Sequence, residues 1–320
     1  MEEKSSCDGG HEFKLLLSCP SGLSPSQVSV VFNEAYDRIP HPDPFLEQSI
    51  FEVWEERERQ NSPLYNWTNF RYGGYTFDVG NDPKQQPHVS LQLGLTNYRD
   101  FVGTNLSPIW ERYLVPSEDD CIQCQHTSSP LGNGAVVETS DKKILVLQRS
   151  NRVGEFPGYF AFPGGNPEPQ DVGIVSHDGF HELNQCRNSK VSQEMFDSIV
   201  CEVVEETGAP ANSLVQNKVA FSSPIFIGIS QRVLNVRPIA FFFIKCNLQS
   251  DEIQQLYSSA QNGFESTQLC AVSMLPYGST FAELRESHVE GKGPSSMRVI
   301  WRTWLLKCPA ATEEALHSTI

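Results

Sequence analysis

The spacing of hydrophobic residues along the chain predicts helices and strands in mixed order. A period near 3.6 residues predicts helices at residues 46–59, 192–207, 251–261 and 294–307. Short apolar runs, some of them alternating with polar residues, predict strands at residues 88–95, 135–138, 144–148, 159–165, 224–230, 233–246 and 268–274, and a further short apolar run lies at 13–17. Strands interleaved with a few helices favour an α/β/α layered domain.

The pattern changes near residue 134. Residues 135–148 contain two apolar runs joined by a turn, which indicates a hairpin. The preceding residues, 116–134, have no apolar period and are predicted to form a linker. Because 320 residues suggest about two domains, we expect an N-terminal extension at 1–124, a main domain at 125–308 and a tail at 309–320.

Composition limits the class of partner. Hydrophobic residues make up 39% and charged residues 20% of the chain, so a sizeable core is expected. The 39 acidic and 24 basic residues leave a formal charge of −15, and this average field disfavours a nucleic acid partner. A small anionic substrate is still compatible with that charge, because a metal ion or an arginine can invert the field inside one cleft.

The sequence favours the cytoplasm, with the nucleus as an open alternative. No apolar run approaches the ~20 residues of a membrane span, so we expect no membrane partner. The acidic start lacks the basic-then-apolar order of a secretory signal, and the nine cysteines are typical of reduced thiols. A weaker hypothesis is a structural zinc site. Its candidate ligands are Cys121, Cys124, His126, His177, His181 and Cys186.

Three glutamates are concentrated near the end of the helix predicted at 192–207. Glu202, Glu205 and Glu206 have i,i+3 and i,i+4 spacings, so they share one arc of the helix. They repel one another, and they lie near the helix C-terminus, where the macrodipole disfavours negative charge. Oxygen ligands at this density suit Mg²⁺, with Mn²⁺ as a substitute. The alternative interpretation is a solvated acidic face.

A turn rich in glycine points to the same chemistry. The strand predicted at 159–165 ends in Pro163, Gly164 and Gly165, which we call the glycine corner. Because glycine has no side chain, the carbonyl group of Gly164 or Gly165 can approach a cation closely. We therefore expect the glycine corner to contribute to a metal site together with the glutamates.

Together these residues resemble the Nudix box, G-x₅-E-x₇-R-E-U-x-E-E-x-G-U, in which U is aliphatic. Residues 201–209, CEVVEETGA, match the end of the box, and residues 164–168, GGNPE, match its start. An insertion at about residues 172–192 separates the two parts. The resemblance implies a metal-dependent hydrolase.

Two positions depart from the box. Cys201 stands where the family has an arginine that pairs with and orients a catalytic glutamate. The first box glutamate corresponds to Asp171 when it is counted from Gly165, and it falls near Glu194 when it is counted back from the helix. The candidates for a general base therefore stay open: Asp171, Glu194, Glu168 and Glu265.

The resemblance extends beyond the box. GGNPEPQ (164–170) and LGLTNYRDFVGTN (93–105) resemble the UDP-glucose and UDP-galactose diphosphatase branch of the Nudix superfamily. This implies a Nudix α/β/α sandwich with a mixed sheet, and an N-terminal α/β extension that contributes to the nucleotide pocket. It also implies Mg²⁺-dependent hydrolysis of UDP-sugars to UMP and sugar 1-phosphate. The implied catalytic and metal-binding residues are Glu202, Glu206, Glu205 in support, and Gly164 or Gly165 through a carbonyl.

The implied substrate needs an aromatic face for uracil and donors for the diphosphate. The candidate substrate-binding residues are Tyr65, Tyr98, Arg149, Gly154, Asn166, Glu168 and Ser295. The rival interpretations are half-buried tyrosines, a surface arginine or glutamate, and a helix-capping serine. Two other functions stay open. One is a Nudix diphosphatase that acts on another nucleoside diphosphate derivative, such as ADP-ribose or a coenzyme A derivative. The other is a non-catalytic Nudix-like binding module, for which three mutually repelling glutamates would be unnecessary.

Overall fold

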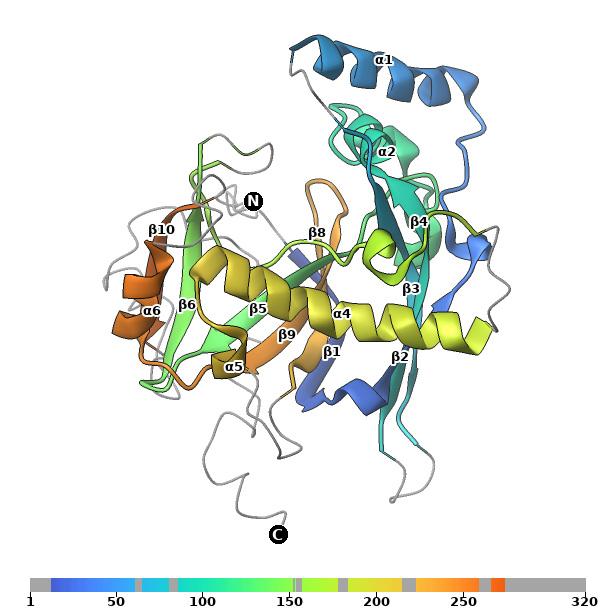
Figure 1. Cartoon of the computed structure of the whole chain (residues 1–320). Helices are drawn as coiled ribbons and strands as arrows, with labels where there is room; N and C mark the ends of the chain where they lie inside the picture. The colour runs from blue at the N-terminus through green and yellow to red at the C-terminus, as the bar shows by residue number, and fades with distance from the viewer. Residues whose placement is uncertain are drawn as a thin grey trace, which may run out of the picture.

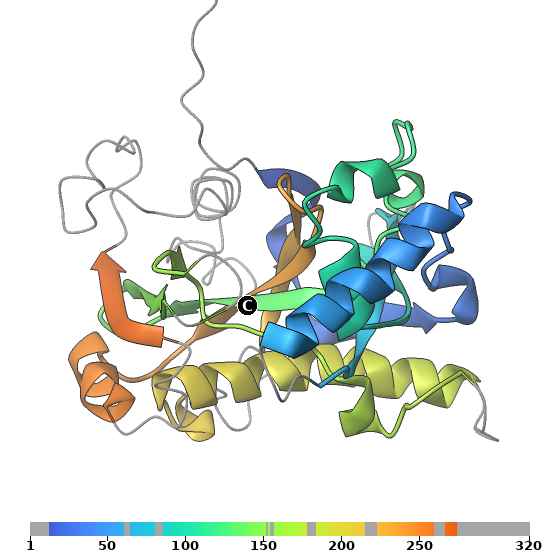
Figure 2. The ribbon, with the colours of Figure 1, turned by 90° about the horizontal axis from the view of Figure 1, so that it is seen from above.

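The computed structural model describes residues 13–60, 65–80, 86–151, 153, 157–177, 184–214, 223–258 and 266–273. In this part of the chain, a seven-stranded sheet and a three-stranded sheet are joined by one long helix, α4 (Asn184–Thr207). α4 runs along one side of the molecule, with its C-terminal half on the larger sheet and its N-terminal half on the smaller one (Figures 1 and 2). The predicted mixed α/β fold class is confirmed.

The larger sheet has the strand order β1–β8–β9–β5–β6–β10, and β7 pairs with β6. The strands are β1 (Phe13–Leu23), β5 (Gly132–Glu138), β6 (Lys143–Arg149), β7 (Phe160–Ala161), β8 (Ile225–Arg232), β9 (Pro238–Lys245) and β10 (Ser266–Ser273). β5 and β9 pair in parallel, and the other pairs are antiparallel. Side chains alternate along β9: Phe242 and Ile244 join the core that includes α4, whereas Phe241 and Phe243 pack on the opposite face.

The smaller sheet and its helices come from the first third of the chain. Its strands are β2 (Val28–Phe32), β3 (Thr68–Asp78) and β4 (His88–Asn97), in the order β2–β4–β3. Helices α1 (Pro44–Gln60) and α2 (Tyr98–Gly103) pack on one another. α1 buries Leu46, Ile50 and Trp54, as the helical period predicts. β2 and β3 were not predicted, because β2 is short and two glycines interrupt the apolar pattern of β3.

Short helices complete the described chain. They are α3 (Asp120–Gln123), α5 (Ala211–Leu214), α6 (Ser250–Tyr257), and the 3₁₀ segments η1 (Pro25–Gln27), η2 (Glu34–Tyr36), η3 (Trp110–Tyr113) and η4 (Pro169–Val172). The helix predicted at 294–307 lies outside the described residues. The predicted boundary between an N-terminal extension and a main domain at residue 124 stays a prediction. β1, which precedes this boundary, pairs with β8 in the larger sheet.

The linker prediction for residues 116–134 is wrong. This segment contains α3 and then becomes fully buried, with Thr127 and Ser128 both 0% exposed. Arg71 compensates for the burial of these polar groups, because its guanidinium donates hydrogen bonds to the carbonyls of Tyr36 (2.8 Å), Cys124 (2.9 Å) and Thr127 (3.2 Å). A stretch without apolar periodicity is therefore part of the interior.

The insertion at about 172–192 lengthens α4, which begins at Asn184 rather than at the predicted residue 192. The added turns bind the edge of β2: the Asn188 side chain accepts a hydrogen bond from the Phe32 N–H (3.0 Å), and the Ser192 hydroxyl donates to the Val28 carbonyl (3.0 Å). At the other end, Gly208 follows the helix with φ +74°, the left-handed conformation expected of a C′ glycine. The insertion thus lets one helix hold both sheets.

Candidate functional site

α4 presents two kinds of face. Phe196, Ile199 and Val203 are buried in the core beneath the larger sheet. A second row contains residues four positions apart: Glu194, Ser198, Glu202 and Glu206. Because this spacing is close to one helical turn, successive members are neighbours on the helix surface. Hydrogen bonds join Glu194 and Glu206 to the loop that contains the glycine corner.

Backbone N–H groups of this loop are held by acceptors on α4 and β5. Gly164 N–H donates to Glu206 Oε2 (2.7 Å), and Glu168 N–H donates to Glu194 Oε1 (3.2 Å). Gly165 N–H donates to Asn133 Oδ1 (2.8 Å), at the start of β5. The loop is therefore fastened to the acidic row rather than free to move away from it.

Asn133 connects the three elements of the site. Its backbone N–H donates to the Gly165 carbonyl (3.0 Å), while its Nδ2 donates to the Ser198 hydroxyl on α4 (3.0 Å). The side chain is only 5% exposed, so these hydrogen bonds form away from water. Asn133 was missed in the sequence, where it appears only as one polar residue in the glycine-rich GNGAVV run.

The glycine corner needs glycine because of close contacts. A Cβ atom on Gly165 would collide with the Glu202 carboxylate, and one on Gly164 would collide with the Asn133 carbonyl. Glu202 is half-buried and lies directly against Gly165, while Glu206 is 8% exposed. Glu205, in contrast, is exposed. Glu202 and Glu206 therefore lie beside the glycine corner, and their role as metal ligands stays a prediction.

The electrostatics of this region favour protonated carboxyl groups or a cation. The pKa of Glu194 is raised to about 7, mainly by burial and in smaller part by the nearby carboxylates of Asp171 and Asp197, against the lowering effect of its hydrogen bond from Glu168 N–H. The pKa of the Glu168 carboxyl is also raised, first by burial and then by the charges of Asp171 and Glu205. The carboxyl groups of the loop and of α4 thus raise one another's pKa beside the glycine corner.

One arginine borders the same loop. Arg237, beside the start of β9, donates from Nη2 to Asn166 Oδ1 (2.9 Å), directly after the glycine corner. Its guanidinium carbon also lies 5.3 Å from the ring centre of Phe101 on α2. Arg237 was not predicted as a site residue, because it lies inside the strand predicted at 233–246 and matches no part of the box; in the structure it lies in the turn before β9.

The predicted aromatic residues lie in the N-terminal part. Trp67 stacks on Tyr98 with ring centres 4.8 Å apart and planes at 18°, and the edge of Trp54 approaches the same tyrosine at 6.0 Å. Tyr98 is also 6.4 Å from Phe101, the ring that contacts Arg237. Tyr65 is 67% exposed, just before β3. α2 therefore carries a series of aromatic contacts toward the loop after the glycine corner.

No protein-family model matches the chain. A protein of Arabidopsis thaliana, named Nudix hydrolase 9, is 62% identical over 268 residues, which cover 83% of this chain and 84% of that protein. The chain belongs to the Nudix hydrolases. The prediction of a hydrolase is confirmed.

More distant relatives of this Nudix hydrolase carry a more specific name. The mouse protein named uridine diphosphate glucose pyrophosphatase NUDT22 is 35% identical over 264 residues, covering 80% of each chain. Its human counterpart is 32% identical over 262 residues, covering 80% of this chain and 81% of that protein. The predicted resemblance to this branch of the Nudix superfamily is thus confirmed.

Among solved structures, a MutT protein of Methanosarcina mazei Go1 matches 45% of this chain and 75% of that chain, at 15% identity and a TM-score of 0.26. This likeness is too low to support an inference. Within the described part of this Nudix hydrolase, no helix is both long and apolar enough to cross a bilayer.

Cys201 occupies the position of the box arginine on α4. The residue is exposed. Partial burial of the thiol, and next the charge of Glu205, raise the pKa of this thiol. Glu206 is instead oriented by the Gly164 N–H. Both candidates for the first box glutamate lie in the acidic region, but Glu194 is hydrogen-bonded to the loop whereas Asp171 lies in η4.

The remaining candidates are Arg149 on β6 and three residues beyond the described part of the chain. Arg149 is the last residue of β6, where its backbone pairs with that of Tyr159. Gly154, Ser295 and Glu265 lie outside the described residues.

The residues proposed for zinc serve other contacts. The Cys124 thiol accepts a hydrogen bond from Gln231 (3.5 Å), and His126 Nδ1 donates to the Ile39 carbonyl (2.8 Å). Burial raises the pKa of the Cys121 and Cys124 thiols to about 11, so both groups are protonated in the metal-free protein. Across the described ranges, no three histidine, cysteine or acidic side chains are grouped as metal ligands; His181 lies outside them.

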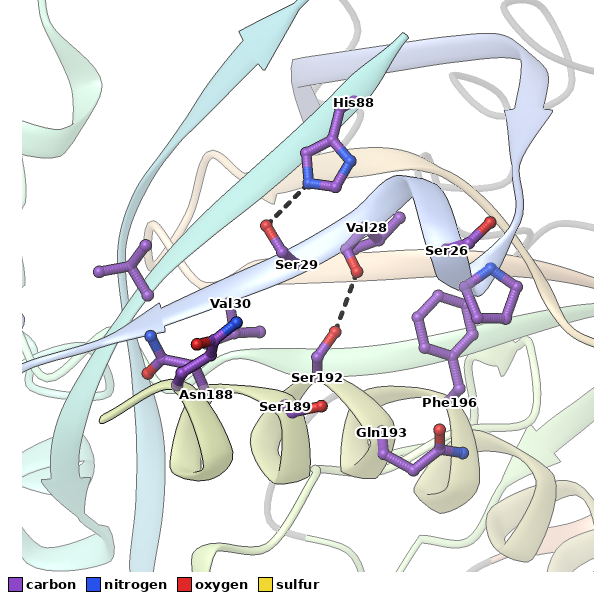
Figure 3. A pocket seen from close by; sticks show the side chains of 13 residues that line it. Ser26, Val28, Ser29, Val30, His88, Asn188, Ser189, Ser192, Gln193 and Phe196 are labelled. Atoms are coloured by element: carbon purple, nitrogen blue, oxygen red, sulfur yellow. Dashed lines mark hydrogen bonds between the residues drawn. The ribbon is translucent and has the colours of Figure 1, made fainter. Parts of the chain in front are cut away.

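A cavity of about 550 Å³ lies elsewhere, between β2 and the N-terminal half of α4 (Figure 3). Hydroxyl, amide and imidazole groups line it, and Ser29 is hydrogen-bonded to His88 at 2.9 Å. Its last polar residue on α4, Gln193, precedes Glu202 by roughly 13 Å of helix, at about 1.5 Å per residue. The cavity is therefore separate from Glu202 and Glu206, although Gln193 is next to Glu194, the first member of the acidic row.

Proposed function

We propose that this Nudix hydrolase cleaves the diphosphate bridge of UDP-sugars and releases UMP and a sugar 1-phosphate. The observation that carries the proposal is the hydrogen-bonded junction between α4 and the glycine corner, which places the Glu202 and Glu206 carboxylates against Gly165 and Gly164. The uridine and sugar specificity is supported by the names of the mouse and human relatives.

Glu202 and Glu206 are the proposed ligands of a Mg²⁺ ion, with Glu205 in support. The residues fit a hard cation, because two carboxylates converge on a backbone turn in an already acidic region. Gly164 is a better carbonyl ligand than Gly165, whose carbonyl accepts a hydrogen bond from Asn133. When bound, Mg²⁺ would stabilise charge on the phosphate oxygens and lower the pKa of a bound water.

A site with only two carboxylate ligands from the protein is sufficient for Mg²⁺. In the described ranges no three acidic side chains form a closed ligand group, whereas Mg²⁺ commonly keeps several waters and binds one or two carboxylates together with substrate phosphates. Mn²⁺ could substitute because it also prefers oxygen ligands.

Glu168 is the proposed general base. Its carboxyl group is exposed and can reach a water molecule, whereas Glu194 is 7% exposed and accepts the hydrogen bond from Glu168 N–H. Glu168 would take a proton from the attacking water as oxygen adds to one phosphorus. The bond from that phosphorus to the bridging oxygen would break, and the other phosphate would leave with the electron pair. Glu194 would hold the backbone of Glu168 in place.

Tyr98, Trp67 and Tyr65 form the proposed aromatic face for uracil. Trp67 covers one side of Tyr98 and is itself 44% exposed, so Trp67 offers an accessible ring in the same group. Stacking alone accepts any base. Selection of uracil would therefore depend on hydrogen bonds to its edge, and residues 93–105 are the proposed source of these groups.

The test is a substrate panel with purified protein and Mg²⁺, in which release of UMP or AMP is measured. A buried polar group left unpaired by the wrong base costs about 1–3 kcal/mol. We expect similar rates with UDP-glucose and UDP-galactose, and at least about tenfold lower kcat/KM with ADP-glucose and ADP-ribose. Comparable rates with the adenine compounds would contradict the UDP-sugar assignment.

A further inference from the structure

Arg237 is held in place by the turn between β8 and β9. Its carbonyl accepts a hydrogen bond from Arg232 N–H (3.0 Å), and its N–H donates to the Asn235 side chain (3.3 Å). The Asn235 carbonyl in turn accepts a hydrogen bond from Asn105 Nδ2 (2.7 Å). Because Asn105 ends the 93–105 segment, the N-terminal part of the chain fixes the turn that carries Arg237.

The guanidinium lies beside the glycine corner. A Cβ atom added to Gly132 would lie 3.3 Å from Arg237 Nη2 and 3.4 Å from the Gly165 carbonyl oxygen. The guanidinium and the glycine corner therefore border the same point on β5. The group also rests over the ring of Phe101, 5.3 Å from the ring centre. A planar cation between an aromatic face and a loop has a restricted orientation, which a flexible ammonium group would lack.

This contact determines which way the Asn166 amide points. A guanidinium carries only donors, so the atom of Asn166 that faces Arg237 must be the carbonyl oxygen. The amide nitrogen is then on the far side of the group, and it makes no hydrogen bond to the described part of the chain. Asn166 is half-buried, so its two N–H donors are accessible to a ligand at the glycine corner.

We propose that Arg237 is a positioning residue that turns the Asn166 amide so that its N–H groups donate to an oxygen of the substrate. This rests on the proposed function, in which the glycine corner binds a diphosphate. Phosphate and sugar hydroxyl oxygens both accept such hydrogen bonds. Through Phe101 and the Asn235–Asn105 hydrogen bond, the same arginine connects the N-terminal part to the loop that binds the substrate.

The test is a double-mutant cycle with Arg237→Lys and Asn166→Ala, measured on the nucleoside diphosphate derivative that the wild type hydrolyses best. We expect each single variant to lower kcat/KM by about tenfold, mainly through KM, because a ground-state contact is lost. The double variant should lose no more than about threefold beyond either single one, since both remove the same interaction. Independent losses that multiply would overturn the proposal.

Two further variants separate positioning from stability. Asn166→Asp keeps an acceptor for Arg237 but presents an oxygen instead of an N–H group to the substrate, so KM should rise more than in Asn166→Ala. Arg232→Lys is the matched control, because Arg232 also lies over an aromatic ring, that of Phe13 at 5.7 Å. Equal effects of Arg232→Lys and Arg237→Lys, or an Asn166→Asp variant with wild-type KM, would contradict the proposal.

The outcomes for substrate and for positioning are distinguishable. If the wild type prefers an adenine compound, the UDP-sugar assignment fails, yet the cycle on that compound still decides the role of Arg237. If no compound is hydrolysed, calorimetric titration with UDP replaces turnover. Weaker binding by the same factor in both single variants and in the double variant supports the proposal, and unchanged binding in Arg237→Lys refutes it.

Discussion

Replacing Glu194 by glutamine would remove a titratable group from the site while keeping the acceptor for Glu168 N–H. Glu194 is 7% exposed, and burial raises its pKa from an ordinary 4.5 to about 7. The folded protein therefore holds this proton at pH values where the unfolded chain has released it. The stability that the protonated group contributes is fully present below pH 4.5 and is lost as the pH rises through about 7.

The magnitude follows from this difference in pKa. At about 1.4 kcal/mol for each pH unit, ionising Glu194 would cost the folded state up to about 3 kcal/mol by pH 8. Relaxation and entry of water reduce that upper bound. We expect Glu194→Gln to be more stable than the wild type at pH 8 by about 1–3 kcal/mol, with little difference near pH 4.5.

The assay is urea unfolding of both proteins from pH 4.5 to 8, with a chelator present so that metal binding does not contribute. The low-pH comparison is the internal control, because the wild-type carboxyl is then protonated and resembles the glutamine amide in charge. Stability curves that stay parallel across this range would refute the reasoning. A lower stability of the variant at pH 8 would show that the Glu194 carboxylate is satisfied in the folded state.

Three further substitutions test the proposed chemistry. Glu206→Gln keeps the acceptor for Gly164 N–H but removes a charge, so kcat should fall at least about 100-fold with an unchanged circular dichroism spectrum; a loss of only a few-fold would contradict the ligand assignment. Glu168→Gln should lower kcat by about 100-fold and abolish the acidic limb of the pH–rate profile, whereas a retained limb would exclude Glu168 as the base. Cys201→Ala should change kcat less than about threefold, because the exposed thiol orients no glutamate; a loss above about tenfold would assign the thiol a catalytic role.

Local pattern determined the elements that bear the chemistry. Helical periodicity alone places the glutamates at 202, 205 and 206 on α4, and Gly208 marks the end of the helix. The apolar run of β9 and the hairpin of β5 and β6 can likewise be predicted from the sequence, because burial on one or two faces imposes a hydrophobic pattern on neighbouring residues. These features depend on contacts close in sequence.

Tertiary structure decided the contacts between distant residues. Asn133 joins Gly165 and Ser198, while Arg237 orients Asn166; neither pairing has a sequence period. The buried polar segment before β5 was mistaken for a linker, because its burial depends on carbonyl groups meeting Arg71 from β3. A polar side chain is compatible with solvent or with an interior partner, and only the folded arrangement shows which partner it has.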